Sequence, residues 1–269
     1  MIYITGDCHA DFRKFASKQR HKLPFTLSEE DSVIVCGDFG MLWAKDETYE
    51  YNLKWLEALP FRILWVQGNH ENFNMIEEYP IEEWNGGKVR HIVRDKVILL
   101  ERGQVFHIED KTFFTFGGAS SHDIQGGVLD RDDPDYDELR RLADMRGLPY
   151  RILNLSWWKQ ELPSEEELQE GNTNLSKVGY QVDYVITHCA ANRIQDVIED
   201  YYFREHGWGR GFYHKDILTN YFEELEDKLN YKHWFFGHYH DEIEIDEKHT
   251  LLYEMIVPLD SYSGRRETE

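Results

Sequence analysis

The sequence predicts an α/β fold in which two mixed β-sheets form a sandwich. The chain has 269 residues, which allows one compact domain or one domain with an appendage. Short apolar runs of strand length recur, and in the early half they alternate with helical patterns, as expected for a parallel sheet. Between residues 97 and 116 the strand-like runs follow one another without a helix, which indicates hairpins. A sandwich of two mixed sheets accommodates both patterns.

Nine apolar runs predict the strands, because each has strand length and ends in glycine or polar residues. Seven of these runs cover residues 2–5, 33–36, 62–66, 104–108, 112–116, 184–187 and 233–236. The last two runs, 242–245 and 250–257, predict an antiparallel pair that closes the fold.

Two segments show the apolar spacing of amphipathic helices. Residues 46–59 place Tyr51, Trp55 and Leu59 at helical spacing. Residues 215–229 carry one apolar face, with most of their acidic residues opposite it. Ser164 followed by Glu167 fits a capping box and predicts the start of a further, acidic helix.

Composition limits the classes of function and partner. Hydrophobic residues make up 41% and aromatic residues 14%, which indicates a globular protein. The net charge of −21 argues against long nucleic acids as partners, because binding a phosphate backbone requires many lysines and arginines. A small anionic substrate at a local site is still compatible with this charge. Protein partners cannot be named from the sequence.

The chain shows no sign of export or of membrane insertion. Its first residues lack the basic region and apolar stretch of a signal peptide, and no apolar run has the length of a bilayer span. Three cysteines, Cys8, Cys36 and Cys189, are too few for a disulfide framework, and we interpret them as small buried apolar residues. These observations predict a cytoplasmic protein with reduced thiols.

Five of the predicted strands end in side chains that can bind metal ions. The segments are Gly6-Asp7-Cys8-His9, Gly37-Asp38-Phe39-Gly40, Gly68-Asn69-His70-Glu71, Thr187-His188-Cys189 and Gly237-His238-Tyr239-His240. In α/β sheets, ligands bind outside the carboxyl ends of the strands, so we expect the five segments to converge on one crevice.

The donor types predict a site for two divalent cations. Imidazole and carboxylate together suit Mn, Fe, Ni or Zn. Spacings of two residues, in Asp7/His9 and in His238/His240, place each pair on one face of a strand. Asp38 is a candidate bridge, because one carboxylate can bind two cations. The candidate ligands are Asp7, His9, Asp38, Asn69, His188, His238 and His240.

The ordered set of segments resembles the calcineurin-like metallophosphoesterase superfamily, and the flanking sequence resembles its bacterial and phage-type branch. The superfamily pattern is Asp-x-His, Gly-Asp, Gly-Asn-His-Glu/Asp, a single His and Gly-His-x-His, and all five blocks occur here in order. The resemblance implies a four-layer α/β/β/α sandwich. It implies one metal ion held by Asp7, His9, Asp38 and His240, and a second held by Asp38, Asn69, His188 and His238.

The resemblance also implies a reaction. It predicts two-metal-dependent hydrolysis of a small or medium phosphate ester, a monoester or a diester, by a metal-bridging hydroxide with His70 as the general acid. The alternatives are a nuclease, a protein Ser/Thr phosphatase and a non-catalytic metal-binding scaffold of the same fold. Protein phosphatases of this superfamily carry Gly-Asp-x-Val-Asp-Arg-Gly at the second block, whereas this chain continues Gly37-Asp38-Phe39-Gly40-Met41, without the second Asp and the Arg.

The least regular stretch of the chain predicts the domain organisation, and two residues are candidate substrate contacts. We predict a single metallophosphoesterase domain over residues 1–260, with an insertion at about 123–183 near the active-site end and a loose tail at 261–269. Arg151 could supply the phosphate contact that the missing arginine would make. His122 follows a glycine-containing turn and could reach the mouth of the site, although we favour a surface histidine there.

Overall fold

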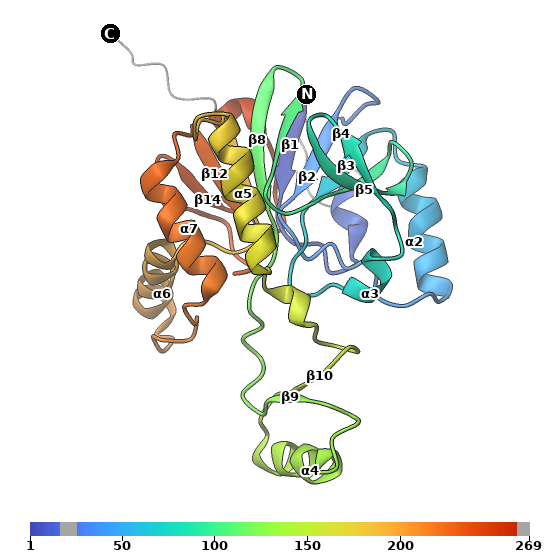
Figure 1. Cartoon of the computed structure of the whole chain (residues 1–269), viewed down its shortest axis with the longest axis vertical. Helices are drawn as coiled ribbons and strands as arrows, with labels where there is room; N and C mark the ends of the chain where they lie inside the picture. Colours follow the sequence, from blue (N-terminus) through green and yellow to red (C-terminus); the bar gives the residue numbers. More distant parts are fainter. Residues whose placement is uncertain (17–25, 263–269) are drawn as a thin grey trace.

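Two mixed β-sheets pack face to face, and helices cover their outer faces (Figure 1). The structure is a computed structural model that describes residues 1–16 and 26–262. Within these ranges, the first sheet has seven strands in the order β15 (Ile256–Pro258), β1 (Ile2–Thr5), β2 (Ser32–Val35), β3 (Arg62–Trp65), β6 (Val97–Leu100), β5 (Gly87–Val93), β4 (Ile81–Trp84). The second has six, in the order β13 (Ile243–Glu244), β14 (His249–Leu251), β12 (His233–Phe236), β11 (Tyr184–Thr187), β8 (Lys111–Phe116), β7 (Gln104–Ile108).

Strands β1, β2, β3 and β6 of the first sheet are buried on both faces. In β1, Ile2 and Ile4 belong to the core between the two sheets, whereas Tyr3 belongs to the core beneath the helices. Successive side chains of a strand point to opposite faces, so a strand covered on both sides carries an unbroken apolar run. This explains why short continuous runs, rather than alternating patterns, mark β1, β2 and β3.

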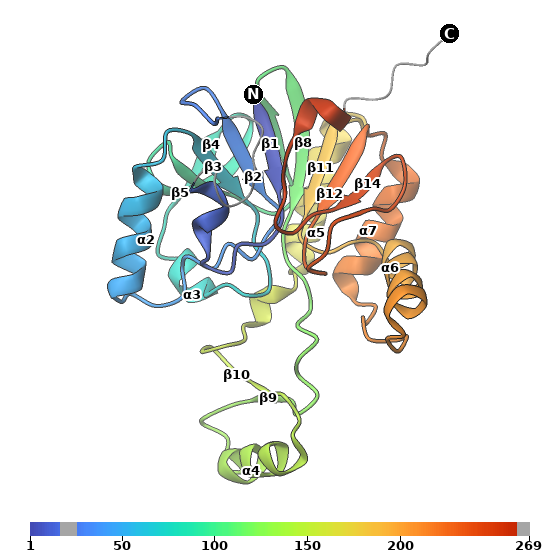
Figure 2. The ribbon, with the colours of Figure 1, turned by 180° about the vertical axis from the view of Figure 1, so that it is seen from behind.

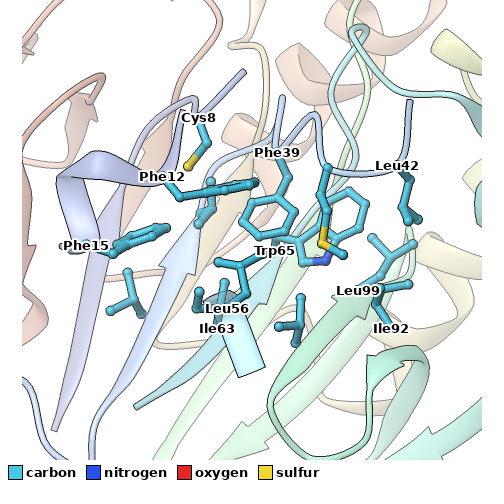
Figure 3. Packing of buried hydrophobic residues seen from close by; sticks show 14 of the residues in the cluster. Cys8, Phe12, Phe15, Phe39, Leu42, Leu56, Ile63, Trp65, Ile92 and Leu99 are labelled. Atoms are coloured by element: carbon cyan, nitrogen blue, oxygen red, sulfur yellow. The ribbon is translucent and has the colours of Figure 1, made fainter. Parts of the chain in front are cut away.

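Helices complete four layers. The helices η1 (Phe12–Phe15), α2 (Glu47–Glu57) and α3 (Phe73–Ile76) cover the first sheet, and α5 (Glu165–Lys177), α6 (Asn192–His206) and α7 (Ile217–Lys228) cover the second (Figure 2). Beneath η1 and α2, Phe39 stacks on Trp65 at 5.1 Å, and Cys8 lies in the same cluster (Figure 3). The predicted α/β/β/α sandwich is therefore confirmed. No helix in the described part of the chain is long and apolar enough to cross a membrane.

Most predicted elements form where expected. The parallel order β1–β2–β3–β6 and the antiparallel hairpin β7–β8 match the two patterns seen in the sequence. Ser164 and Glu167 form the predicted capping box of α5. All three cysteines are buried and free. The hairpin β4–β5 was not predicted, although its Asn85-Gly86 turn, with φ of 49° and 95°, is a strong hairpin signal.

The prediction of one closing pair at 242–257 is wrong in its second half. Strands β13 and β14 pair antiparallel, but the chain then leaves the second sheet, and β15 pairs antiparallel with β1. The buried ammonium of Lys14 binds the carbonyl of Tyr253 at 2.7 Å and so satisfies the backbone at this crossing. No glycine or proline lies between β14 and β15. The crossing is stabilised by a long-range contact, so the local sequence gives no signal for it.

An arm projects from the sandwich between β8 and α5. It contains β9 (Val128–Leu129), α4 (Tyr136–Arg146) and β10 (Arg151–Ile152), which lie away from the sheets in both views (Figure 1 and Figure 2). The buried Arg102 joins the two ends of the arm, because it donates to the carbonyls of Gly117 at 2.8 Å and Gln160 at 2.6 Å. Helix α5, also inside the range 123–183, packs on the second sheet.

The end of the chain continues past β15 as the 3₁₀ helix η3 (Leu259–Tyr262). The first two residues of the predicted tail belong to this helix, and residues 263–269 lie outside the described residues.

Candidate metal centre and active site

The five strand-end segments meet at one end of the sandwich. Strands β1, β2 and β3 are parallel neighbours in the first sheet, and β11 and β12 are parallel neighbours in the second. Their carboxyl ends therefore point the same way within each sheet, which brings the following loops together. Contacts join the two sets of loops, since the backbone N–H of His238 donates to Asp7 Oδ1 at 3.0 Å.

Four of the predicted ligands form a compact donor set. Asp7, His9, Asp38 and His240 each offer one ligand atom, and these four atoms lie within 4.8 Å of one another. The Nε2 atoms of His9 and His240 are 2.9 Å apart, and His240 Nε2 lies 3.2 Å from Asp7 Oδ2. These are the residues that the resemblance assigns to one metal ion.

The other predicted ligands lie directly beside this set. His188 Nε2 is 3.2 Å from Asn69 Oδ1 and 3.4 Å from Asp38 Oδ1. The rings of His188 and His238 are 5.0 Å apart between centroids. The other oxygen of Asp38, Oδ2, is 3.8 Å from His9 Nδ1, so the Asp38 carboxylate lies between the two sets.

Glycines allow these side chains to approach neighbouring strand ends. A Cβ on Gly68 would overlap Asp38 Oδ1, and a Cβ on Gly237 would overlap Asp7 Oδ1. At Gly37, which has a φ of +98°, a Cβ would overlap the ring of His188. A residue with a side chain in place of any of these glycines would therefore fill the space that a carboxylate or imidazole now occupies. The glycine before one candidate ligand makes room for a different candidate ligand.

Several of the candidate ligands have a backbone conformation that is unusual for residues with side chains. His9, Asp38, His238 and His240 have φ of 48°, 43°, 72° and 53°. Such conformations cost about 1–3 kcal/mol each and persist only where surrounding contacts enforce them. Two of those contacts are the bonds from the His9 N–H to the Asp38 carbonyl, at 2.8 Å, and from the His70 N–H to Asp38 Oδ1, at 2.7 Å.

The electrostatics of the site favour bound cations. Asp7 and Asp38 are each 1% exposed. Burial alone would raise their pKa values, but the charge of His188 and the hydrogen bonds from neighbouring histidines together outweigh it and hold the pKa of both carboxyls well below the usual range. Burial would lower the pKa of His188, yet the charges of Asp38 and Asp7 raise it to about 9. Two buried carboxylates require compensating positive charge, which divalent cations supply, so this donor set fits metal ions.

A backbone contact orients His188. Its Nδ1 lies 2.7 Å from the carbonyl of Cys36, so Nδ1 carries a proton and Nε2 is the ring nitrogen that faces Asn69 and Asp38. Ligand imidazoles in metal sites commonly have this arrangement, in which a carbonyl fixes the tautomer.

Sequence reasoning missed the buried residues that hold the ligand loops. Lys14, 2% exposed, donates to the Asp7 carbonyl at 2.6 Å and to the Tyr253 carbonyl at 2.7 Å. The Tyr253 ring in turn stacks on His240 at 4.8 Å. Glu71, fully buried, accepts from the N–H of Phe39 at 2.8 Å. Glu71 could have been found, because it ends the Gly-Asn-His-Glu block, whereas nothing in the sequence distinguishes Lys14 from a surface lysine.

A second missed set positions Asn69. The Asn69 amide donates to Ser121 Oγ at 3.2 Å, which turns its Oδ1 toward His188. The N–H of Ser121 donates to Glu161 Oε2 at 3.2 Å, and Glu161 lies where the arm returns to the sandwich. Burial raises the pKa of Glu161 to about 8. The base of the arm therefore supports one of the predicted ligands.

The remaining predicted residues lie at the rim of the site. Nη2 of Arg151 is 3.4 Å from both ring nitrogens of His70 and 2.6 Å from Asp123 Oδ2. The ring of His122 is 5.5 Å from that of His238 and 4.8 Å from that of Phe212. The ring of His122 is half-buried among these residues, and its role as a substrate contact stays a prediction.

Comparison with known proteins gives a family and a structural likeness. The sequence profile described as calcineurin-like phosphoesterase matches residues 1–242. Among solved structures, the chain is similar to the phosphopantetheinyl hydrolase PptH from Mycobacterium tuberculosis, with 13% identity and a TM-score of 0.45 over 94% of this chain and 87% of that chain. None of the curated proteins matches the sequence significantly.

Proposed function

The chain belongs to the calcineurin-like phosphoesterase family, and from this premise we propose that it is a two-metal-dependent hydrolase of a small or medium phosphate ester. The ester is a phosphomonoester or a phosphodiester. The observation that carries the proposal is the convergence of Asp7, His9, Asp38 and His240 within 4.8 Å. The second set of candidate ligands and His70 lie directly beside them.

In this proposal Asp7, His9, Asp38 and His240 hold one ion, and Asp38, Asn69, His188 and His238 hold the other. Carboxylate and imidazole donors favour Mn, Fe, Ni or Zn. Bound ions would supply Lewis-acid stabilisation of the phosphoryl oxygens and a water of lowered pKa. The protein itself keeps Asp38 between the two sets of candidate ligands. The N–H of His70 donates to Asp38 Oδ1, and Gly68 leaves space for the carboxylate.

His70 is the proposed general acid. Its ring lies 5.2 Å from that of His9, at the edge of the candidate centre. Burial and the charges of Arg151 and His9 lower the pKa of His70, and the charge of Asp38 offsets this only in part. The negative charge of a bound phosphate would raise the pKa and favour the imidazolium. When water attacks phosphorus and the ester bond breaks, His70 passes its proton to the leaving oxygen, a contribution of about 10²–10⁴-fold.

Arg151 and His122 are proposed substrate contacts. The guanidinium of Arg151 reaches the ring of His70, so a phosphate beside His70 would lie within its range. Asp123 competes for the same guanidinium. His122 lies next to His238.

The charge of the whole chain supports a compact substrate. Two divalent cations would outweigh the charges of Asp7 and Asp38 and create a small positive well in a protein of net charge −21. Such a well attracts a small phosphate ester while the surrounding surface repels a long nucleic acid. A cytoplasmic location is part of the proposal, supported by three buried cysteines without disulfides.

The test combines metal content with turnover. After reconstitution with Mn²⁺, the protein should bind two ions and hydrolyse 4-nitrophenyl phosphate or bis(4-nitrophenyl) phosphate. Asp38→Asn, which keeps the size of the side chain, should lose at least about 10³-fold in activity while remaining folded. The matched control is Asp110→Asn, whose carboxylate is 85% exposed and pairs with Lys111. Wild-type activity in Asp38→Asn would exclude the bridge, and a two-metal protein without turnover would indicate a scaffold.

A further inference from the structure

A cavity of about 370 Å³ opens beside His9 and His70. Its walls come from the loop after β2, including Met41 and Trp43, and from the first half of α2, including Tyr49 and Asn52. The volume lies in the range of about 300–1,000 Å³ that small-molecule sites occupy. The cavity shares its histidines with the candidate metal centre, so a molecule bound at the metal ions can extend into it.

The charges around this cavity restrict what it can hold. Among the described residues that line it there is no lysine or arginine, and Asp46 is the one acidic residue. Asp46 is also the N-cap of α2, because its carboxylate accepts from the N–H of Tyr49 at 2.9 Å. Away from His9 and His70, a group that carries a second phosphate would meet no positive partner here, whereas an uncharged group would not be repelled by Asp46.

Trp43 gives the cavity an aromatic wall. Its side chain is 38% exposed, and its ring packs edge-to-face on Trp158 at 5.7 Å. Trp158 is buried, and the Trp43 carbonyl accepts from the Asn72 amide at 2.8 Å. Trp158 thus holds the indole of Trp43 in place while the indole borders the cavity, as a stacking platform requires.

We propose that this cavity binds the leaving group of the substrate, and that this group is an uncharged aryl or nucleoside moiety stacked on Trp43. The inference rests on the proposed function. A general acid must reach the leaving oxygen, so the leaving group lies on the side of His70, where the cavity is. Water adds to phosphorus, the bond to the leaving oxygen breaks, and the proton of His70 goes to that oxygen. The product released into the cavity is therefore a neutral alcohol or phenol.

The test compares Trp43→Ala with a matched tryptophan elsewhere. Trp208 is 59% exposed and lines a separate cavity of about 400 Å³ with Phe212 and Tyr213. With whichever 4-nitrophenyl ester the metal-loaded enzyme hydrolyses, Trp43→Ala should raise KM about tenfold and change kcat less than about threefold. Trp43→Phe should retain most of the affinity, and Trp208→Ala should match wild type.

Inhibition by inorganic phosphate separates stacking from damage to the metal centre. Phosphate is small enough to bind at the metal ions without entering the cavity, so its Ki should be equal in wild type and Trp43→Ala. An unchanged KM in Trp43→Ala, or a raised KM in Trp208→Ala instead, would overturn the inference and leave the proposed function standing. Absence of turnover by the two-metal wild-type protein on both esters would overturn the proposed function and the inference together.

Discussion

Replacing Lys14 by methionine should loosen the loop that carries Asp7 and His9. The ammonium donates to the carbonyls of Asp7 and Tyr253 at 2.6 and 2.7 Å. A hydrogen bond from a charged donor contributes about 1.5–3 kcal/mol, so these two amount to roughly 3–6 kcal/mol. These contributions already include the desolvation of the ammonium, so the free energy of unfolding of the methionine variant should fall by about 3–6 kcal/mol.

Urea unfolding in the presence of a chelator measures this loss without a contribution from bound metal. A metal titration of the folded variant should show about 10–100-fold weaker affinity, because the loop positions a ligand. The control is Lys228→Met, whose exposed ammonium pairs with Glu224 at 3.0 Å, and it should stay within about 0.5 kcal/mol of wild type. Equal unfolding free energies for the two variants would refute the role of Lys14.

Three further changes test the site. Gly68→Ala should lose metal, because its Cβ would overlap Asp38 Oδ1, whereas Gly209→Ala, with no heavy atom within 4 Å, should retain it; metal content of the purified variants decides. Glu161→Gln should remove a pH dependence of stability. Burial raises the pKa of Glu161 from 4.5 to about 8. The free energy of unfolding is therefore highest below pH 4.5 and falls by at most about 5 kcal/mol as the pH rises through 8. Urea unfolding at pH 5 and pH 9 checks this, and an identical pH dependence in the variant would contradict it. Arg151→Met should raise the KM for the hydrolysed 4-nitrophenyl ester about tenfold, while Arg140→Met in the same arm should not; equal KM values would exclude the proposed phosphate contact.

The fold class and the donor residues could be predicted because both depend on local features. Unbroken apolar runs mark the buried strands β1, β2 and β3. The side chains that follow them, such as Asp7 and Asp38, are candidate metal ligands by residue type alone. Parallel strands then bring such segments together without further information.

The supporting residues could not be predicted in the same way. Lys14 is a cation in a short helical turn, and only the carbonyl of Tyr253, 239 positions away, makes it a buried clamp. The crossing of β15 to the first sheet likewise depends on contacts between distant segments, such as the bond from Lys14 to the Tyr253 carbonyl. Glu161 and Arg151 come from the arm, whose path back to Ser121 and His70 leaves no periodic pattern in the sequence.

The sequence by itself therefore determined which side chains are candidates for the chemistry and which kind of fold presents them, because residue type and apolar pattern are local properties. Only the tertiary structure decided how these side chains meet. Asp7 accepts from the N–H of His238, 231 positions away, and the Asp38 carboxylate occupies the space that Gly68 leaves open. It also decided that an aromatic cavity without lysine or arginine among its described lining residues adjoins His70. Such proximities depend on how distant segments pack, which no short stretch of sequence records.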